Sequence, residues 1–89
     1  MDTAFKKTLK AKAHHLKPVI LIGAKGLTPA VTQETDGALL VHELIKVKVS
    51  GADKTARLEM MTELCKALQA DLVQLIGNTA VIYREKPQS

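Results

Sequence analysis

The fold of this 89-residue chain is decided by residues 18–29, with the sequence PVILIGAKGLTP. The four apolar residues 19–22 are rich in β-branched side chains, which predicts a strand covered on at least one face. Gly23 and Gly26 follow it. Glycine lets a backbone bend where a Cβ would clash and lets another backbone approach closely. We therefore predict a strand that runs directly into a tight glycine-x-x-glycine turn.

A helix is expected immediately behind this turn. Thr28 is a good N-cap residue, and Pro29 suits the first helical position because its missing N–H would be unpaired there. The free N–H groups of the helix start and the ammonium of Lys25 are then expected to face one small volume. Such a place favours a bound phosphate.

The composition is that of one folded domain. The chain is 46% hydrophobic and 25% charged, values that are ordinary for a globular protein and not for a disordered one. It has one cysteine, so no intrachain disulfide can form, and we expect a cytoplasmic location. The apolar runs are too short to cross a bilayer, and the N-terminal segment does not resemble a signal peptide. No membrane association is predicted.

The positive charge is concentrated in the first third of the chain. Residues 1–33 carry six lysines and one aspartate, a net charge of +5, whereas residues 34–89 carry seven basic and eight acidic residues. A one-sided basic field favours polyanionic partners, nucleic acid before an anionic membrane. The alternative is that the lysines serve solubility alone, which would not require this asymmetry.

The elements are expected in the order α-β-α-β-α-β-β. Apolar periodicity, caps and turn residues predict helices at about 3–15, 28–41 and 54–69, and strands at 18–22, 43–49, 72–76 and 79–83. Two β-α-β crossovers imply parallel strands, and the closing hairpin adds an antiparallel pair. The predicted fold is a single α/β domain, residues 1–85, with a four-stranded mixed sheet packed by helices. Residues 86–89 are expected to form a frayed tail.

The sequence contains no recognisable catalytic or metal-binding motif. His14 and His15 are adjacent and would not face each other on a helix, so they make a poor metal pair. Cys65 falls on an apolar helix stripe and is interpreted as a core residue. Lys25 precedes Gly26, where a nucleotide-binding P-loop needs glycine before lysine and a longer spacing. We predict no enzyme activity, no cofactor, no metal and no small-molecule substrate.

An RNA-binding role fits the remaining features. Glycine-x-x-glycine loops clamp RNA backbones in the KH fold. Phe5 and Tyr83 are the only aromatic residues, so base stacking on the sheet is not expected, and recognition by charge and backbone shape is favoured. The basic residues proposed to contact RNA, apart from the loop, are Lys6, Lys7, Lys10, Lys12, Lys17, Lys46, Lys48 and Arg84. For each, the competing interpretation is an ordinary solvated surface residue.

Several blocks of the chain resemble the CRM domain, and more closely its stand-alone bacterial form, the YhbY family. The resemblance covers nearly the whole chain. It is carried by Ala13-His14, Leu16, Pro18-Val19, residues 22–28 (IGAKGLT), residues 42–48 (HELIKVK) and residues 76–84 (IGNTAVIYR).

This resemblance implies an RNA-binding protein that contacts ribosomal RNA in precursors of the large ribosomal subunit and acts in ribosome assembly. It also implies a fold similar to the C-terminal domain of translation initiation factor three. The implied RNA contacts are Gly23, Ala24, Lys25 and Gly26, with support from the N-terminal lysines. The polar residues 35–37 depart from the family pattern by interrupting a helix that is usually more apolar. The alternative function is a ribosome-associated protein-interaction module with incidental RNA contact. No heptad seam demands a dimer, so a monomer is expected.

Overall fold

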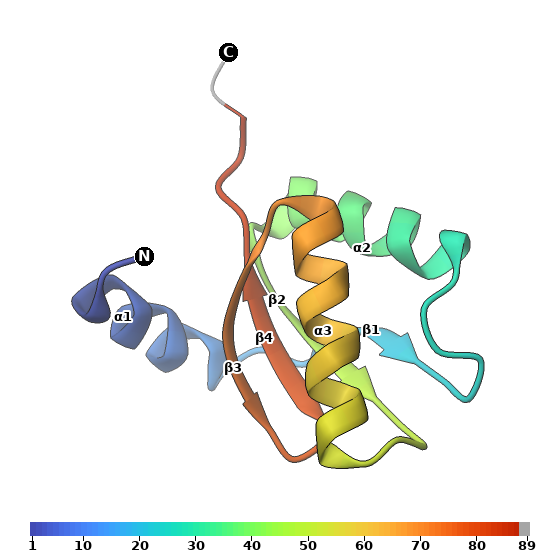
Figure 1. Cartoon of the computed structure of the whole chain (residues 1–89). Helices are drawn as coiled ribbons and strands as arrows, with labels where there is room; N and C mark the ends of the chain where they lie inside the picture. The colour runs from blue at the N-terminus through green and yellow to red at the C-terminus, as the bar shows by residue number, and fades with distance from the viewer. Residues whose placement is uncertain (88–89) are drawn as a thin grey trace.

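The computed structural model describes residues 1–87 and shows one α/β domain (Figure 1). Its elements follow the predicted order: α1 (Thr3–Ala13), β1 (Pro18–Ile22), α2 (Pro29–His42), β2 (Leu44–Val49), α3 (Lys54–Leu68), β3 (Asp71–Ile76) and β4 (Thr79–Tyr83). Asp2, Thr28 and Asp53 cap the three helices, each accepting a hydrogen bond from a backbone N–H three residues on. The prediction of a single α/β domain is confirmed.

The four strands form one mixed sheet in the order β1-β2-β4-β3. β1 pairs with β2 in parallel, and β4 runs antiparallel to both of its neighbours. β3 therefore has the same direction as β2, as the second crossover predicts, but β4 lies between them. Only the first of the two crossovers joins strands that pair directly.

Helices lie on both faces of the sheet (Figure 1). α2 and α3 cover one face and enclose the larger core, which includes Ile22, Leu39, Val47, Met61 and Ile82. α1 packs on the other face in a smaller cluster made of Leu9, Ala13, Val73 and Val81. Residues of β2 alternate between the two faces of the sheet. Ile45, Val47 and Val49 are buried under α2 and α3, and the residues between them face the other side. Among the described residues, no helix is long and apolar enough to span a membrane.

The polar middle of α2 does not interrupt the helix. Thr35 is fully buried, and its hydroxyl donates to the carbonyl of Val31 at 2.8 Å, so the buried polar group is satisfied. Asp36 pairs with Arg84, and Gly37 is exposed. The departure from the family pattern at residues 35–37 is thus accommodated by local and tertiary hydrogen bonds.

The end of the chain is described as far as Pro87. The backbone N–H of Lys86 donates to the Glu43 carboxylate at 2.7 Å, which ties the start of the predicted tail to the end of α2. Of the tail predicted at 86–89, residues 88–89 lie outside the described residues.

Cys65 lies in the larger core and is expected to make stability depend on alkaline pH. Burial, with a smaller contribution from the negative charge of Asp71, raises the pKa of the Cys65 thiol from 9.0 to about 11. The folded state therefore holds this proton more tightly than the unfolded state. The corresponding stability is fully present below pH 9 and is lost as pH rises to 11, by about 2 kcal/mol.

Urea denaturation of the wild type and of Cys65→Ala at pH 8 and pH 11 checks this expectation. The wild type should lose about 2 kcal/mol more than the variant over that interval. Equal losses in the two proteins would show that other groups carry the alkaline dependence.

Candidate nucleic-acid interface

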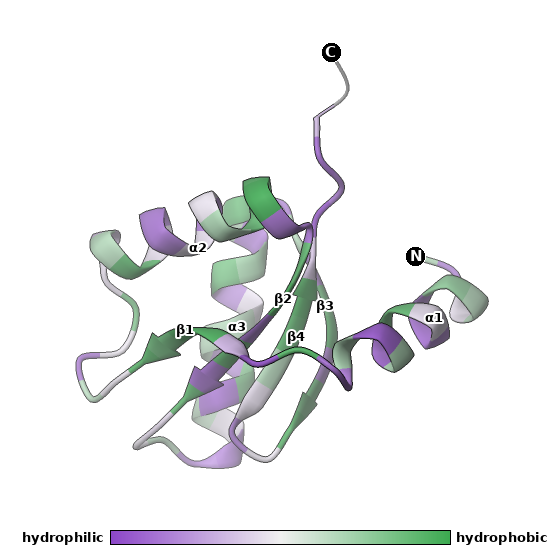
Figure 2. Cartoon of the chain, turned by 180° about the vertical axis from the view of Figure 1, so that it is seen from behind, coloured by the Kyte–Doolittle hydropathy of each residue, from purple (hydrophilic) through white to green (hydrophobic). Residues whose placement is uncertain are grey.

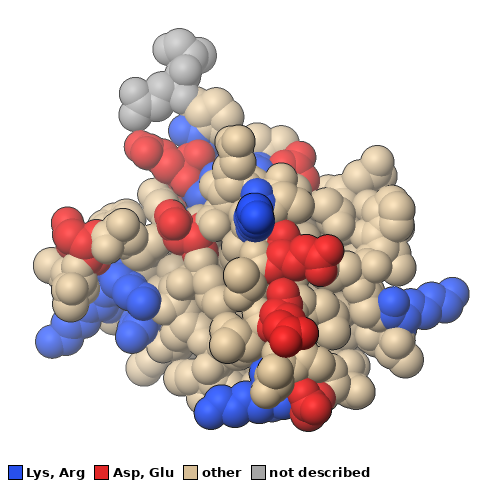
Figure 3. All heavy atoms as spheres, viewed as in Figure 1, with Lys and Arg blue, Asp and Glu red and all other residues tan. Residues whose placement is uncertain are grey.

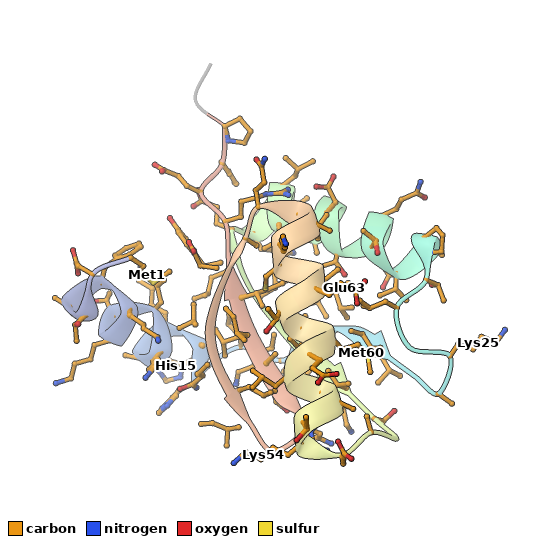
Figure 4. The ribbon with its side chains drawn as sticks, viewed as in Figure 1. Met1, His15, Lys25, Lys54, Met60 and Glu63 are labelled. Carbon is orange, nitrogen blue, oxygen red and sulfur yellow. The ribbon has the colours of Figure 1, made fainter. Side chains whose placement is uncertain are left out.

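The glycine loop is a tight turn at the end of β1. The Gly26 N–H donates to the Gly23 carbonyl at 3.0 Å, which closes a β-turn with Ala24 and Lys25 at its corners. Both corner residues are exposed. Figure 4 shows the Lys25 side chain extending outward from the tip of the loop, away from the rest of the molecule. The loop therefore presents one flexible cation to the surroundings.

The two glycines of this loop are there for different reasons. Gly26 has a φ of +70°, a backbone conformation that residues with a side chain disfavour, so the shape of the turn explains the glycine at this position. Gly23 has no positive φ, and a Cβ built on it would meet nothing within 4 Å. The prediction that a Cβ would clash at Gly23 is wrong, because the space beside it is open. The protein's own packing thus gives no reason for glycine at position 23.

The start of α2 offers fewer free donors than the sequence suggested. Pro29 has no N–H, the Val31 N–H is bonded to the Thr28 hydroxyl at 3.2 Å, and the Thr32 N–H is bonded to the Thr28 carbonyl. Among residues 29–32, all of which are described, this leaves the Ala30 N–H for a ligand. The expected gathering of N–H groups and Lys25 around one volume is therefore wrong, since Thr28 takes the Val31 and Thr32 N–H groups and Lys25 points outward.

Lys46 and Lys48 share the sheet face opposite α2 and α3. In the strand register Lys48 lies between Leu21 of β1 and Thr79 of β4, and Lys46 lies between Pro18 and Val81. Leu21 is two residues before Gly23, and paired strands are about 4.8 Å apart, so Lys48 lies near the loop end of this face. Seen from behind, β2 carries hydrophilic colour on the side of the sheet away from α2 and α3 (Figure 2).

The lysines of α1 and of the following segment lie at the other end of β1. Figure 4 shows His15, at the end of α1, and Lys25 on opposite sides of the molecule. β1 has five residues, which separates the two regions by about 16 Å of extended chain. Lys7, Lys12 and Lys17 are exposed, and Lys6 and Lys10 are half-buried. Apart from Arg84, the predicted cations form an extended arrangement along the sheet, with Lys46 and Lys48 between its ends.

The same face carries exposed apolar side chains that the sequence pattern did not reveal. Val19, Leu21 and Ile76 are 49%, 60% and 67% exposed. A continuous apolar run such as 19–22 does not show which of its faces is covered, so periodicity alone gave no signal. We call Val19, Leu21, Lys46, Lys48 and Ile76 the open face of the sheet.

Arg84 differs from the other predicted contacts because its guanidinium is bonded within the protein. One of its terminal nitrogens donates to the Asp36 carboxylate at 2.7 Å and to the Leu68 carbonyl at 3.0 Å, and the other donates to the Asp36 carbonyl at 3.1 Å. These bonds connect the segment after β4 to both α2 and α3. The predicted RNA contact of Arg84 competes with this internal role.

Removing either partner of the Arg84–Asp36 pair is expected to destabilise the domain. Because the arginine side chain is 18% exposed and the aspartate 45%, Arg84→Met should lower the free energy of unfolding by about 2 kcal/mol and Asp36→Ala by about 1 kcal/mol. Urea denaturation of both single variants and of the double variant measures the coupling. Losses that simply add in the double variant would contradict a direct interaction.

Acidic side chains gather on the opposite side of the molecule. Figure 3 shows carboxylates along the surface of α3, with basic side chains above and below them as well as at the two sides of the view, and Figure 4 places Glu63 and Lys54 on this helix. The basic residues of α3 offset its carboxylates, so this surface has no net negative charge, whereas the loop, the open face and α1 present lysines that attract a polyanion. The preference for one side of the sheet therefore rests on the lysines of the loop, the open face and α1, and not on repulsion by α3.

Comparison with known proteins agrees with this architecture. The model of the CRS1/YhbY (CRM) domain matches residues 1–84. A probable RNA-binding protein of Pseudomonas aeruginosa is 46% identical over 83 residues, which are 93% of this chain and 80% of that protein. An RNA-binding protein of Haemophilus influenzae is 42% identical over 89 residues, all of this chain and 90% of that protein.

A solved structure shares the fold. The solution structure of a hypothetical protein from Staphylococcus aureus matches with a TM-score of 0.87 and 33% sequence identity, and the match covers 99% of this chain and 92% of that one. The sequence resemblance, the family match and the shared fold all extend over nearly the full length. The chain therefore belongs to the CRS1/YhbY (CRM) domain family.

Proposed function

We propose that this chain is a non-catalytic RNA-binding protein that contacts ribosomal RNA in precursors of the large ribosomal subunit and acts in ribosome assembly. It acts in the cytoplasm as a monomer, without a cofactor. RNA as the ligand is supported by the two relatives described above, of which one is named as a probable RNA-binding protein and the other as an RNA-binding protein. The ribosomal target is supported by the family resemblance of the sequence.

The proposed mode of binding is supported mainly by the open space beside Gly23. This glycine is not required by backbone conformation or by packing, and it lies between the exposed cation of Lys25 and the open face. A missing side chain there allows a phosphodiester backbone to approach the turn closely. In this mechanism the basic side chains attract the RNA, and residues Gly23, Ala24, Lys25 and Gly26 hold its backbone.

Gly23→Asp tests this mechanism because the substitution should not disturb the fold. Apart from Gly23 and its two chain neighbours, no described residue has an atom within 4 Å of the added Cβ, so the melting temperature should stay close to that of the wild type. The added side chain and its charge should nevertheless lower the affinity for RNA about 10-fold or more, since they occupy the approach to the turn.

Gly37→Asp is a matched control. Like Gly23, Gly37 has no neighbour within 4 Å of a built Cβ among the described residues, but it is exposed and lies in the middle of α2. It adds the same charge away from the loop, and its effect on RNA affinity should be less than about 2-fold. If Gly23→Asp binds RNA and large-subunit precursors as well as Gly37→Asp does, the loop is not the contact.

The competing function is a protein-interaction module on the ribosome, and the exposed Val19, Leu21 and Ile76 favour it. Salt dependence separates the two. RNA binding through several phosphates should weaken steeply as salt rises, with a slope near 0.7 per phosphate neutralised on single strands. Association with ribosomal proteins through apolar surface should change little over the same range.

A further inference from the structure

A pocket between α1 and the start of β2 is not part of the loop mechanism described above. Its volume is about 540 Å³, within the range of about 300–1,000 Å³ that is typical of small-ligand sites. It is lined by Phe5, Leu9, Lys12, His15, Leu16, Lys17, Val19, His42, Glu43, Leu44, Ile45 and Tyr83. Val19 belongs to both the pocket and the open face, so the pocket opens onto the side of the sheet that we propose to bind RNA.

Both aromatic residues of the chain lie in this pocket. Phe5 and Tyr83 are 78 residues apart in sequence, and their ring centroids are 5.4 Å apart at an interplanar angle of 79°. Phe5 is 41% exposed, so part of its ring remains accessible beside the half-buried Tyr83. Aromatic rings with an accessible surface pack against unstacked nucleobases in RNA-binding proteins.

The polar lining of the pocket is mostly basic. Lys12 and Lys17 contribute ammonium groups, and His15 and His42 contribute imidazoles, all on exposed residues. Among the described residues, the lining has one carboxylate, that of Glu43, and it accepts the Lys86 N–H at 2.7 Å. An anionic group is therefore favoured at the end of the pocket formed by α1 and residues 15–17, and disfavoured near Glu43.

We propose that this pocket binds one unstacked nucleotide of RNA. The base packs against the Phe5–Tyr83 pair and the apolar wall, and the phosphate lies beside Lys12 and Lys17. A nucleotide combines a flat apolar surface with an anion, which matches an aromatic pocket bordered by lysines. An acidic peptide would satisfy the lysines but not the paired rings. This inference rests on RNA being the ligand of the chain, and it adds a base contact at the end of the sheet opposite the glycine loop.

Titration of the wild-type protein with adenosine 5′-monophosphate, followed by NMR of side-chain methyl groups, tests the pocket directly. The methyl signals of Leu16, Val19 and Leu44 should shift, because these residues line the pocket. Inorganic phosphate alone and adenosine alone should each shift them less at equal concentration. If the pocket methyls do not respond, or respond equally to phosphate alone, the proposal is overturned.

Two matched pairs of variants identify the groups involved. Lys12→Ala removes one ammonium beside the phosphate and should weaken binding of the nucleotide about 5-fold, whereas Lys66→Ala, which removes a lysine from the last turn of α3, should change it less than 2-fold. His15→Ala should weaken binding more than His14→Ala, since the neighbouring His14 does not line the pocket. Equal effects within each pair would contradict the assignment.

The same proteins separate this inference from the proposed function. Suppose that the wild type binds single-stranded RNA and Gly23→Asp does not, but neither RNA nor the nucleotide shifts the methyl signals of the pocket. The pocket proposal then fails, while the loop mechanism stands. If the nucleotide shifts the methyl signals of the pocket but Gly23→Asp binds RNA as the wild type does, the loop mechanism fails and the pocket proposal stands.

Discussion

Reversing the charges of Lys25 and Lys48 together should lower the affinity for single-stranded RNA about 100-fold at 0.1 M salt. Lys25 is at the tip of the glycine loop, and Lys48 lies beside Leu21 on the open face. An ammonium that neutralises one phosphate of a single strand releases about 0.7 counterion, which at 0.1 M salt contributes about 5-fold to affinity. A carboxylate in its place removes that contribution and adds repulsion, so two reversals reach about 100-fold or more.

The control for this prediction is the double variant Lys54→Glu with Lys66→Glu. It changes the net charge by the same amount, but both positions belong to α3, on the other side of the sheet. Its affinity should fall less than about 5-fold, because the field of distant exposed charges is screened within about 10 Å. Fluorescence anisotropy over 50–300 mM salt measures both variants. The slope of log affinity against log salt should decrease by about 1.4 only for the first variant, and equal losses would show that net charge alone governs binding.

The element order was predictable because its signals are local. Thr28 with Pro29, and Asp53 before α3, mark helix starts by side-chain hydrogen bonds to residues three positions on. The alternation of 44–49 and the turn at Gly77-Asn78 likewise depend on near neighbours. The sheet order was not predictable in this way. β4 lies between β2 and β3 through pairings such as Val47 with Ala80, which connect residues far apart in the sequence.

The same distinction between local and long-range contacts decides which parts of the candidate site could be predicted. The loop and its exposed lysine follow from residues 23–26 alone and are where the sequence predicted them. The role of Arg84 could not be read from the sequence, because its partner Asp36 is 48 residues away. The same is true of the pocket, whose two rings come from opposite ends of the chain. Because the chain has two aromatic residues, the sequence predicted that bases would not stack on the sheet. The fold nevertheless brings the two rings together, where they can contact one base.

Leu39→Ala should cause the largest loss of stability among the substitutions considered. Leu39 is fully buried between α2 and the sheet, in the core that also holds Ile22 and Met61. Truncating a buried leucine removes its transfer free energy and leaves a cavity, at a cost of about 3–4 kcal/mol. For a domain of this size, that corresponds to a melting temperature lower by about 15–25 °C.

Leu40→Ala is the matched control, because the same change is made at the next residue of α2, which is 47% exposed. It should cost less than about 1 kcal/mol, since little apolar surface is removed from the core. Thermal and urea denaturation of both variants measure the difference. Because α2 follows the glycine loop directly, Leu39→Ala should also lose RNA binding in parallel with unfolding, whereas Leu40→Ala should bind as the wild type does. Similar losses of stability in the two variants would mean that α2 is not held against the sheet by Leu39.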